Sequence, residues 1–226
     1  MGEIADKYEE IKDSVPDHVE LVPATKGRSA DEVREVVDAG ADAIGENYTH
    51  PEAVRKHGEL GEDAGEIRWE LIGHLQKNDI NKALPIFDRV QTVESLSKAE
   101  HIDKRVERAG KEVMPILVEI NSGNEESKYG LRPEKDALDE IIRGISGLEH
   151  LRLDGLMTMG PFTGNPEDAR PYFEVTRKLY DYGKNLVEGK DRMEVLSMGM
   201  TNSYRVAIEE GANMIRVGTA IFGPRN

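Results

Sequence analysis

Residues 19–45 read VELVPATKGRSADEVREVVDAGADAIG, and this stretch contains one complete strand–helix–strand unit. Its apolar beginning predicts a strand. Ser29 stands three residues before Glu32, which is the spacing of a capping box, so we expect a helix to begin there. A stripe of valines follows on one face of this helix, and Gly40, a residue typical of helix C-termini, precedes a second apolar run. The stretch therefore predicts the strand–helix repeat of a parallel sheet.

The same pattern recurs along the chain. VVDAGADAI at 36–44 resembles AIEEGANMI at 207–215, and each segment reads as a helix end, a glycine and a following strand. Further helices are predicted at 3–13, before the first strand, and at 166–186. The apolar runs predict eight strands, at residues 19–25, 42–45, 68–73, 87–93, 114–120, 151–157, 193–198 and 214–217.

Eight strands that alternate with helices predict a single-domain (β/α)8 TIM barrel over residues 1–226, with an additional N-terminal helix. The alternative is an open doubly wound sheet. It is disfavoured because no GxGxxG follows the first strand and GxxxxGK[ST] occurs nowhere. No linker-like segment divides the chain, so we expect one domain.

The composition excludes several classes of protein. The 44 acidic and 30 basic residues give a net charge of −14, which repels phosphate backbones, so nucleic acid is not an expected partner. No apolar run approaches the roughly 18 residues needed to cross a bilayer, so we expect no membrane association. The absence of cysteine excludes disulfides and fits a reducing cytoplasm. We expect a cytoplasmic monomer, and the acidity is also compatible with a salt-rich cytoplasm.

Lys26 stands where the first predicted strand ends, in the segment VPATKGR. The active groups of a barrel gather at this end of the strands. A partly desolvated lysine amine loses its proton more readily, and the neutral amine can attack an aldehyde to form a Schiff base. The alternative is a lysine that only reaches into solvent from the barrel rim.

The loops after the seventh and eighth strands predict a phosphate site, because backbone amides and a helix N-terminus commonly face an anion there. SMGMT and VGTAIFG offer glycines for close backbone approach and three hydroxyls as donors, those of Ser197, Thr201 and Thr219. Arg216 lies inside the eighth strand, where a charge requires either a ligand or a buried carboxylate in a structural ion pair. No spacing of His, Asp or Glu indicates a metal site.

Several motifs resemble, in order and spacing, those of the pyridoxal 5′-phosphate (PLP) homeostasis proteins. These motifs are VPATKGRSADEVREVVDAG, GENYTH, WELIGHLQKN, SKYGL, GLMTMGP, LSMGMT and RVGTAIFG, and the resemblance covers residues 19–226. It implies a barrel of the alanine racemase N-terminal type in which Lys26 binds PLP as a Schiff base. It also implies that Asn47 lies beside the cofactor ring and that Arg216 faces the pyridine nitrogen. The residues implied around the phosphate are Ser197, Gly199, Thr201, Gly218 and Thr219.

Two positions depart from the family pattern. The family usually has a second lysine and a proline shortly after the Schiff-base lysine, and this chain has Arg28 and Ser29 there. Arg28 keeps the positive charge. Asp79 replaces a lysine that is common after LQKN.

The resemblance implies a carrier that sequesters PLP and releases it to apo-enzymes, with no catalytic residue. An arginine opposite the pyridine nitrogen supports this, because it discourages protonation of that nitrogen and weakens the ring as an electron sink. Lys128, in the polar loop after the fifth strand, is a candidate to accept the aldehyde during release. The alternative interpretation of Lys128 is an exposed loop lysine.

Two other functions remain open at this point. A slow amino-acid racemase would use Lys26 as one base and would need a second acid/base opposite it. In the resembling racemases, a tyrosine of a second domain supplies that group. We expect no such domain after Asn226, so Tyr48 or Tyr129 would have to replace it. The other alternative is a Schiff-base aldolase that acts on a sugar phosphate.

Overall fold

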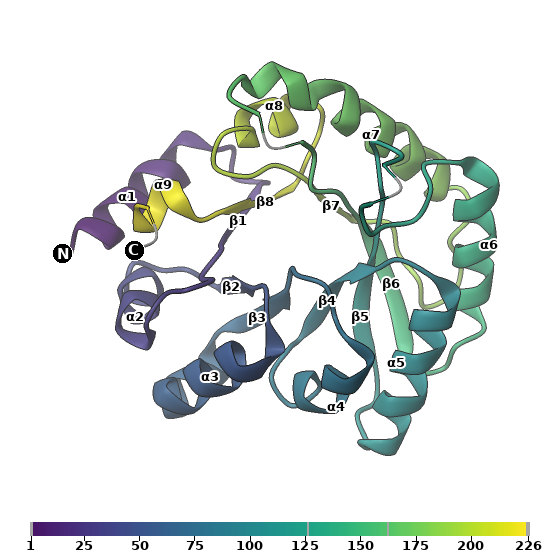
Figure 1. The fold of residues 1–226 in the computed structure, drawn as a ribbon, viewed down its shortest axis with the longest axis horizontal. Coiled ribbons are helices and arrows are strands. Elements are labelled where there is room, and N and C mark those ends of the chain that lie inside the picture. The colour runs from purple at the N-terminus through teal and green to yellow at the C-terminus, as the bar shows by residue number, and fades with distance from the viewer. Residues whose placement is uncertain (1, 126, 162, 225–226) are drawn as a thin grey trace.

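The computed structural model describes residues 2–125, 127–161 and 163–224. Its eight parallel strands form one sheet in the order β1-β8-β7-β6-β5-β4-β3-β2, which Figure 1 shows curving around a centre. The strands are β1 (Glu20–Pro23), β2 (Ala43–Glu46), β3 (Arg68–Leu71), β4 (Arg89–Val93), β5 (Met114–Glu119), β6 (Leu151–Met157), β7 (Val195–Ser197) and β8 (Met214–Val217).

The first and last strands of this order, β1 and β2, meet just beyond β1. Ala24 and Gly45 form an isolated parallel bridge, and the backbone N–H of Thr25 donates to the carbonyl of Gly45 at 2.9 Å. A Cβ at Gly45 would lie 3.2 Å from the side chain of Val22 on β1, so glycine allows close packing of the two strands here. The sheet is therefore a nearly closed barrel, which confirms the predicted fold class.

Helices surround the barrel, and α1 lies beside α9, so the first and last described helices are neighbours (Figure 1). The helices are α1 (Glu3–Ser14), α2 (Ala30–Asp38), α3 (Val54–Leu60), α4 (Ile80–Ala83), α5 (Leu96–Arg108), α6 (Lys135–Ser146), α7 (Arg170–Gly183), α8 (Tyr204–Glu209) and α9 (Thr219–Phe222).

The predicted capping box at the start of α2 is confirmed. The N–H of Glu32 donates to the hydroxyl of Ser29 at 3.2 Å, and the N–H of Ser29 donates to the Glu32 carboxylate at 2.7 Å. After the helix, Gly40 has φ +89° and donates to the carbonyl of Val37. The next N–H, that of Ala41, reaches back to Val36, which completes a Schellman motif.

The second copy of the sequence pattern forms the same local structure after α8. Gly211 has φ +90° and donates to the carbonyl of Ile208 at 2.9 Å. The N–H of Ala212 donates to the carbonyl of Ala207 at 2.8 Å. The repeated glycine therefore has one physical role at both places, which is to turn the chain from a helix into the next strand.

The observed elements differ from the predicted ones mainly at their ends. β6 and β8 match the prediction, while β3 ends at Leu71 and β7 begins at Val195. The helix predicted over 166–186 is a short 3-10 helix that continues into α7 and ends at Gly183. The helix after β7, α8, begins at Tyr204, after a turn in which the N–H of Ser203 donates to the carbonyl of Met200.

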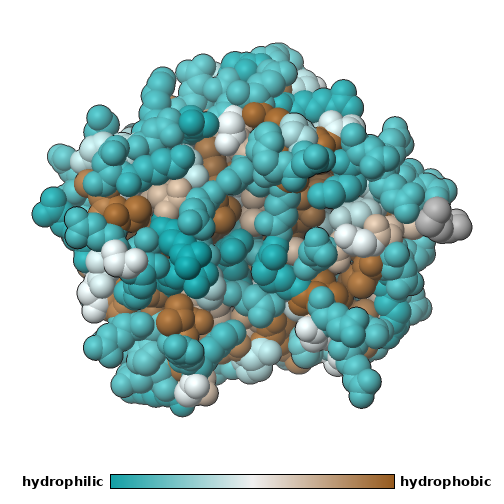
Figure 2. All heavy atoms as spheres, turned by 180° about the vertical axis from the view of Figure 1, so that it is seen from behind, coloured by the Kyte–Doolittle hydropathy of each residue, from teal (hydrophilic) through white to brown (hydrophobic). Residues whose placement is uncertain are grey.

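Most of the core lies between the barrel and its helices, where residues such as Val33, Ile102 and Leu138 have no exposed surface. Figure 2 shows the opposite side from Figure 1, where hydrophilic side chains cover most of the surface and hydrophobic ones gather only in separate areas. In the described part of the chain, no helix is both long enough and apolar enough to span a bilayer.

Candidate functional site

A cavity of about 570 Å³ opens at the carboxyl ends of the strands, next to the point where β1 and β2 meet. This is the end of a barrel at which ligands bind. The residues that line it come from the strand ends and loops of β1, β2, β3, β6, β7 and β8. Its lining includes six of the eight predicted site residues, namely Lys26, Asn47, Thr201, Arg216, Gly218 and Thr219.

Lys26 follows β1 and is half-buried at the cavity. Its Nζ donates to the hydroxyl of Tyr48 at 3.1 Å and lies 4.7 Å from the centre of that ring. Tyr48 is 51% exposed, so this contact lies at the solvent side of the cavity. The amine is therefore accessible to a ligand and is oriented by an aromatic neighbour.

Arg216 extends from β8 to the cavity and is almost completely buried. Its guanidinium donates to the carbonyl of Thr158 at 2.8 Å and to the hydroxyl of Ser197. Burial lowers the pKa of Arg216 to about 10, and the charge of Glu119 partly offsets this effect. In the described part of the chain, the hydrogen-bond partners of the Arg216 guanidinium are neutral groups, so its charge is available to a ligand in the cavity.

A chain of hydrogen-bonded polar side chains inside the barrel holds the guanidinium of Arg216 in place. The hydroxyl of Ser197 donates to Oε1 of Gln91 at 2.8 Å, and Nε2 of Gln91 donates to Glu70 at 2.9 Å. Because β4 and β7 are not neighbours in the sheet, the contact between Gln91 and Ser197 crosses the barrel interior. Glu70 is held in turn by Arg89 at 3.1 Å. The network orients the arginine without neutralising it.

Two predicted phosphate residues do not line the cavity. Ser197 is fully buried beneath Arg216, where its hydroxyl is used within the network. Gly199 has φ +91°, and a side chain there would lie 2.8 Å from Cα of Tyr204. Gly199 therefore allows the loop after β7 to turn tightly against α8. Sequence spacing alone does not distinguish these supporting positions from positions that face a ligand.

The other predicted residues after β7 and β8 lie together. The hydroxyl of Thr201 accepts the N–H of Ala220 at 3.3 Å, which joins the two loops. A side chain at Gly218 would lie 3.1 Å from the carbonyl of Ala24, so this loop also approaches β1 closely. Thr201, Gly218 and Thr219 thus form one wall of the cavity.

Asn47 follows β2 and lines the cavity. It can take this position because Gly73, in the loop after β3, has no side chain to collide with it. A Cβ at Gly73 would lie 2.2 Å from the carbonyl oxygen of Asn47. Glycine after β3 is therefore required for the observed position of Asn47.

Arg28 is a cavity residue that was not among the predicted site residues. Its guanidinium donates to the carbonyl of Gly223, lies 3.3 Å from the carboxylate of Glu32 and stacks 5.5 Å from the ring of Phe222. A signal for this residue was present in the sequence, since a cation stands where the family usually has a lysine. Met159 and Met200 also line the cavity; they lie within the motifs GLMTMGP and LSMGMT but were not among the predicted site residues.

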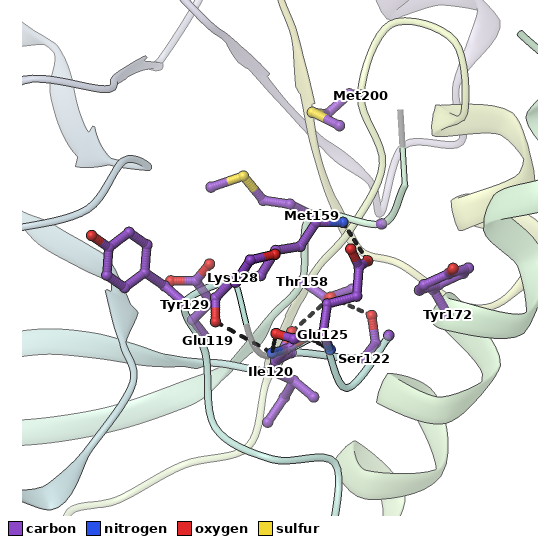
Figure 3. A pocket seen from close by; sticks show the side chains of 14 residues that line it. Glu119, Ile120, Ser122, Glu125, Lys128, Tyr129, Thr158, Met159, Tyr172 and Met200 are labelled. Carbon is purple, nitrogen blue, oxygen red and sulfur yellow. Dashed lines mark hydrogen bonds and ion pairs between the residues drawn. The ribbon is translucent and has the colours of Figure 1, made fainter. Parts of the chain in front are cut away.

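A second pocket of about 390 Å³ lies beside the cavity, and Met159 and Met200 line both. Figure 3 shows Lys128 and Glu125 pointing toward each other in this pocket. The Nζ of Lys128 donates to the carboxylate of Glu125 at 2.5 Å. Lys128 is thus at the neighbouring pocket and does not line the cavity that contains Lys26.

Glu119, at the end of β5, also lines the second pocket. Burial, followed by the nearby charge of Glu94, raises the pKa of Glu119 to about 7. Tyr129 is 60% exposed and stacks on His74 at 3.9 Å between ring centres. In the part of the chain that the structure describes, His, Asp and Glu form no cluster that could hold a metal ion.

The geometry defines a single barrel with a lysine and a buried arginine at one cavity. The family model described as "Alanine racemase, N-terminal domain" matches residues 1–226. A pyridoxal phosphate homeostasis protein of Aquifex aeolicus is 36% identical over 207 residues, which cover 91% of this chain and 86% of the relative. The chain therefore belongs to the alanine racemase N-terminal domain family, and within it to the pyridoxal phosphate homeostasis proteins.

Solved structures agree with this assignment. The structure of PipY from Synechococcus elongatus with PLP bound superimposes with a TM-score of 0.86 at 29% identity, covering 97% of this chain and all of PipY. Alanine racemase of Clostridium difficile superimposes with a TM-score of 0.78 at 16% identity, and the match covers 98% of this chain and 56% of the racemase. The racemase similarity shows the shared barrel fold.

Proposed function

We propose that this protein binds PLP in the cavity and serves as a carrier in PLP homeostasis. The observation that carries the proposal is the presence of the Lys26 amine and the Arg216 guanidinium at one cavity of suitable size. The family relationship supports it, since a relative is named for PLP homeostasis and PipY has been solved with PLP bound. We expect a cytoplasmic monomer with one domain over residues 1–226.

The residues present fit such a ligand. Lys26 would hold the aldehyde carbon of PLP through an imine, and Asn47 would lie beside the ring. Arg216 is a buried charged donor and needs a hydrogen-bond acceptor in the ligand. The unprotonated pyridine nitrogen of PLP would supply that acceptor. Thr201, Gly218 and Thr219 would hold the phosphate, with Ser197 and Gly199 supporting Arg216 and the loop.

Arg28 adds a second cation at the same cavity. PLP carries a phosphate dianion, and the chain as a whole has a net charge of −14. Local cations are therefore needed to attract the ligand against the long-range repulsion of the protein.

The lining favours binding over racemisation. Its titratable residues, within the described part of the chain, are Lys26, Arg28 and Arg216. A two-base racemase needs a second acid/base across the ring from Lys26. Tyr48 contacts Lys26 itself, and Tyr129 lines the neighbouring pocket. Neither tyrosine lines the cavity, so neither stands across it from Lys26 as racemisation requires.

The test is the absorbance of the purified protein with PLP, followed by borohydride reduction and mass mapping of the labelled peptide. We expect an imine band that the reductant removes, a label on the peptide that contains Lys26, and loss of both in Lys26→Ala. A label on another peptide, or no label, contradicts the proposal. A protein that takes up no PLP but cleaves a sugar phosphate would be the aldolase instead.

Delivery is tested separately from binding. PLP-loaded protein is mixed with an apo-enzyme that requires PLP, and recovery of that enzyme's activity is followed over time. We expect Lys128→Ala to slow the transfer relative to the parent, because Lys128 lies at the pocket beside the cavity. Equal transfer rates assign Lys128 no role in release and leave PLP binding by Lys26 unaffected.

A further inference from the structure

Lys56, on α3, is a lysine with no exposed surface, and it does not line the cavity. A buried ammonium is costly unless it is paired and hydrogen-bonded. The proposed PLP site does not use this charge directly. The contacts of Lys56 indicate what it does instead.

These contacts converge on the segment that carries Lys26. The Nζ of Lys56 donates to the carbonyl of Thr25 at 2.7 Å and to the carboxylate of Glu46. It also lies 3.6 Å from the carboxylate of Glu52. Thr25 directly precedes Lys26, so the charge of Lys56 acts one residue away from the proposed imine position.

The two carboxylates hold the same segment on both sides. Glu46 accepts the hydroxyl of Thr25 at 2.5 Å, and Glu52 accepts the backbone N–H of Gly27. Burial raises the pKa of Glu46, and the charge of Lys56 opposes that rise. Lys56 therefore stabilises the ionised carboxylate that binds Thr25.

Loss of Lys56 would remove the cation that lies between the carboxylates of Glu46 and Glu52. One carboxylate oxygen of Glu46, Oε2, has no hydrogen-bond partner among the described residues, so the other oxygen carries all the contacts of the group. Without a nearby cation, the buried carboxylate of Glu46 and the partly buried carboxylate of Glu52 would repel each other beside the backbone of Thr25 and Gly27.

We infer that Lys56 is a positioning residue for Lys26, because the cluster of Lys56, Glu46 and Glu52 fixes the backbone on both sides of the reactive amine. The inference rests on the proposed function. A fixed backbone presents the amine at one distance from the PLP aldehyde, whereas a mobile one would have to be ordered each time the imine forms.

The test compares two ligands that differ at the aldehyde. Pyridoxine 5′-phosphate has the ring and phosphate of PLP but carries an alcohol in place of the aldehyde, so it cannot form an imine. In Lys56→Met, we expect the dissociation constant for PLP to rise about tenfold or more, while that for pyridoxine 5′-phosphate stays within about threefold of the parent. A merely structural role would weaken both ligands alike.

Lys98→Met is the matched control. Lys98 is also a buried lysine paired with a carboxylate, that of Glu94 at 2.8 Å, but its other contact is His74, away from the Lys26 segment. We expect both ligands to bind this variant as they bind the parent, with melting temperatures measured for every variant. An equal selective loss of PLP binding in Lys98→Met would contradict the inference.

The inference is wrong if Lys56→Met folds and the ratio of its dissociation constants for PLP and pyridoxine 5′-phosphate equals that of the parent. If Lys56→Met does not fold, Glu52→Ala decides, because it removes the acceptor of the Gly27 N–H and the 3.6 Å contact with Lys56 but leaves the fully buried pair of Lys56 and Glu46 in place. There we expect PLP binding to weaken about threefold while pyridoxine 5′-phosphate binding is unchanged, and an unchanged ratio overturns the inference. Absence of a borohydride label on Lys26 in the parent would instead remove the proposed function itself.

Discussion

At the scale of single residues, the site combines charges that the fold makes unusual. Arg216 is held by neutral partners, Thr158 and Ser197, and its pKa is lowered to about 10 by burial. Glu119 is a buried carboxyl whose pKa is raised to about 7. Burial makes the charged form of each group unfavourable, so the ionisation of each group changes the free energy of unfolding.

Glu119 predicts a pH dependence. Its pKa rises from 4.5 to about 7 on folding, so the folded protein binds its proton more tightly than the unfolded chain does. The associated stability is fully present below pH 4.5 and is lost as the pH rises through 7. The loss is about 3 kcal/mol. In Glu119→Gln we expect this loss to be absent, so the free energy of unfolding of the variant should exceed that of the parent increasingly as the pH rises from about 5 to about 8.

Urea unfolding of the apo-proteins at several pH values measures the difference. The other carboxylates titrate in both proteins, so they cancel in the comparison. Parallel stability curves for the parent and Glu119→Gln would show that the carboxyl has an ordinary pKa.

Gly73 gives a residue-scale prediction for binding. An alanine side chain would meet the backbone of Asn47, with 2.2 Å between its Cβ and the carbonyl oxygen, so Asn47 must move. We expect Gly73→Ala to weaken PLP binding about tenfold, because a displacement near 1 Å at a binding group has effects of this size. Gly65→Ala is the control, since its Cβ would have no atom within 4 Å. Spectroscopic titration with PLP measures both, and equal affinities would mean that the position of Asn47 is not needed.

At the scale of elements, the sequence predicted where the strands and helices lie better than where they end. Apolar runs predicted β6 and β8 to the residue, and the Ser29–Glu32 spacing predicted the start of α2. The helix end at Gly183 was not predictable, because the sequence from 184 onward keeps helix-forming residues and the chain leaves the helix through turns.

The same limit applies to the candidate site. Lys26 is recognisable as a charge at the end of an apolar strand, and Arg216 as a charge inside one. The neighbouring sequence alone is enough to identify both. Ser197 was expected to face a phosphate, yet it contacts Gln91 across the barrel, a contact between strands that are not sequence neighbours. Such contacts depend on how the sheet closes, and local sequence does not encode that directly.

Two glycines, one after a helix and one inside a helix, predict opposite effects of the same substitution. Gly40 has φ +89°, and a Cβ there would meet only open space, so Gly40→Ala should cost about 1 kcal/mol through the backbone alone. Gly58 lies inside α3, also with open space, and has no positive φ. Gly58→Ala should therefore stabilise the protein by about 0.5–1 kcal/mol. Thermal and urea unfolding measure both, and effects of the same sign would contradict the assigned helix C-terminus.

At the scale of the whole molecule, net charge is the dominant electrostatic property. The chain carries −14, and many of its ion pairs, such as Lys7–Glu3 and Arg55–Glu59, lie at the exposed surface. Exposed pairs each contribute roughly 0–1 kcal/mol, and salt weakens them. Repulsion among the excess acidic groups acts across the entire surface, and salt weakens that repulsion too.

We expect the repulsion to decide the outcome at neutral pH. Raising NaCl from about 0.01 M to about 1 M shortens the Debye length from roughly 30 Å to roughly 3 Å, so the free energy of unfolding should increase. The control is the same series near pH 5.0, the isoelectric point expected from the sequence, where the excess negative charge is absent. There the increase should disappear, because screening then acts mainly on favourable pairs. An equal stabilisation by NaCl at both pH values would assign the effect to exclusion of the salt from the protein surface, and the net charge would then have no measurable influence on stability.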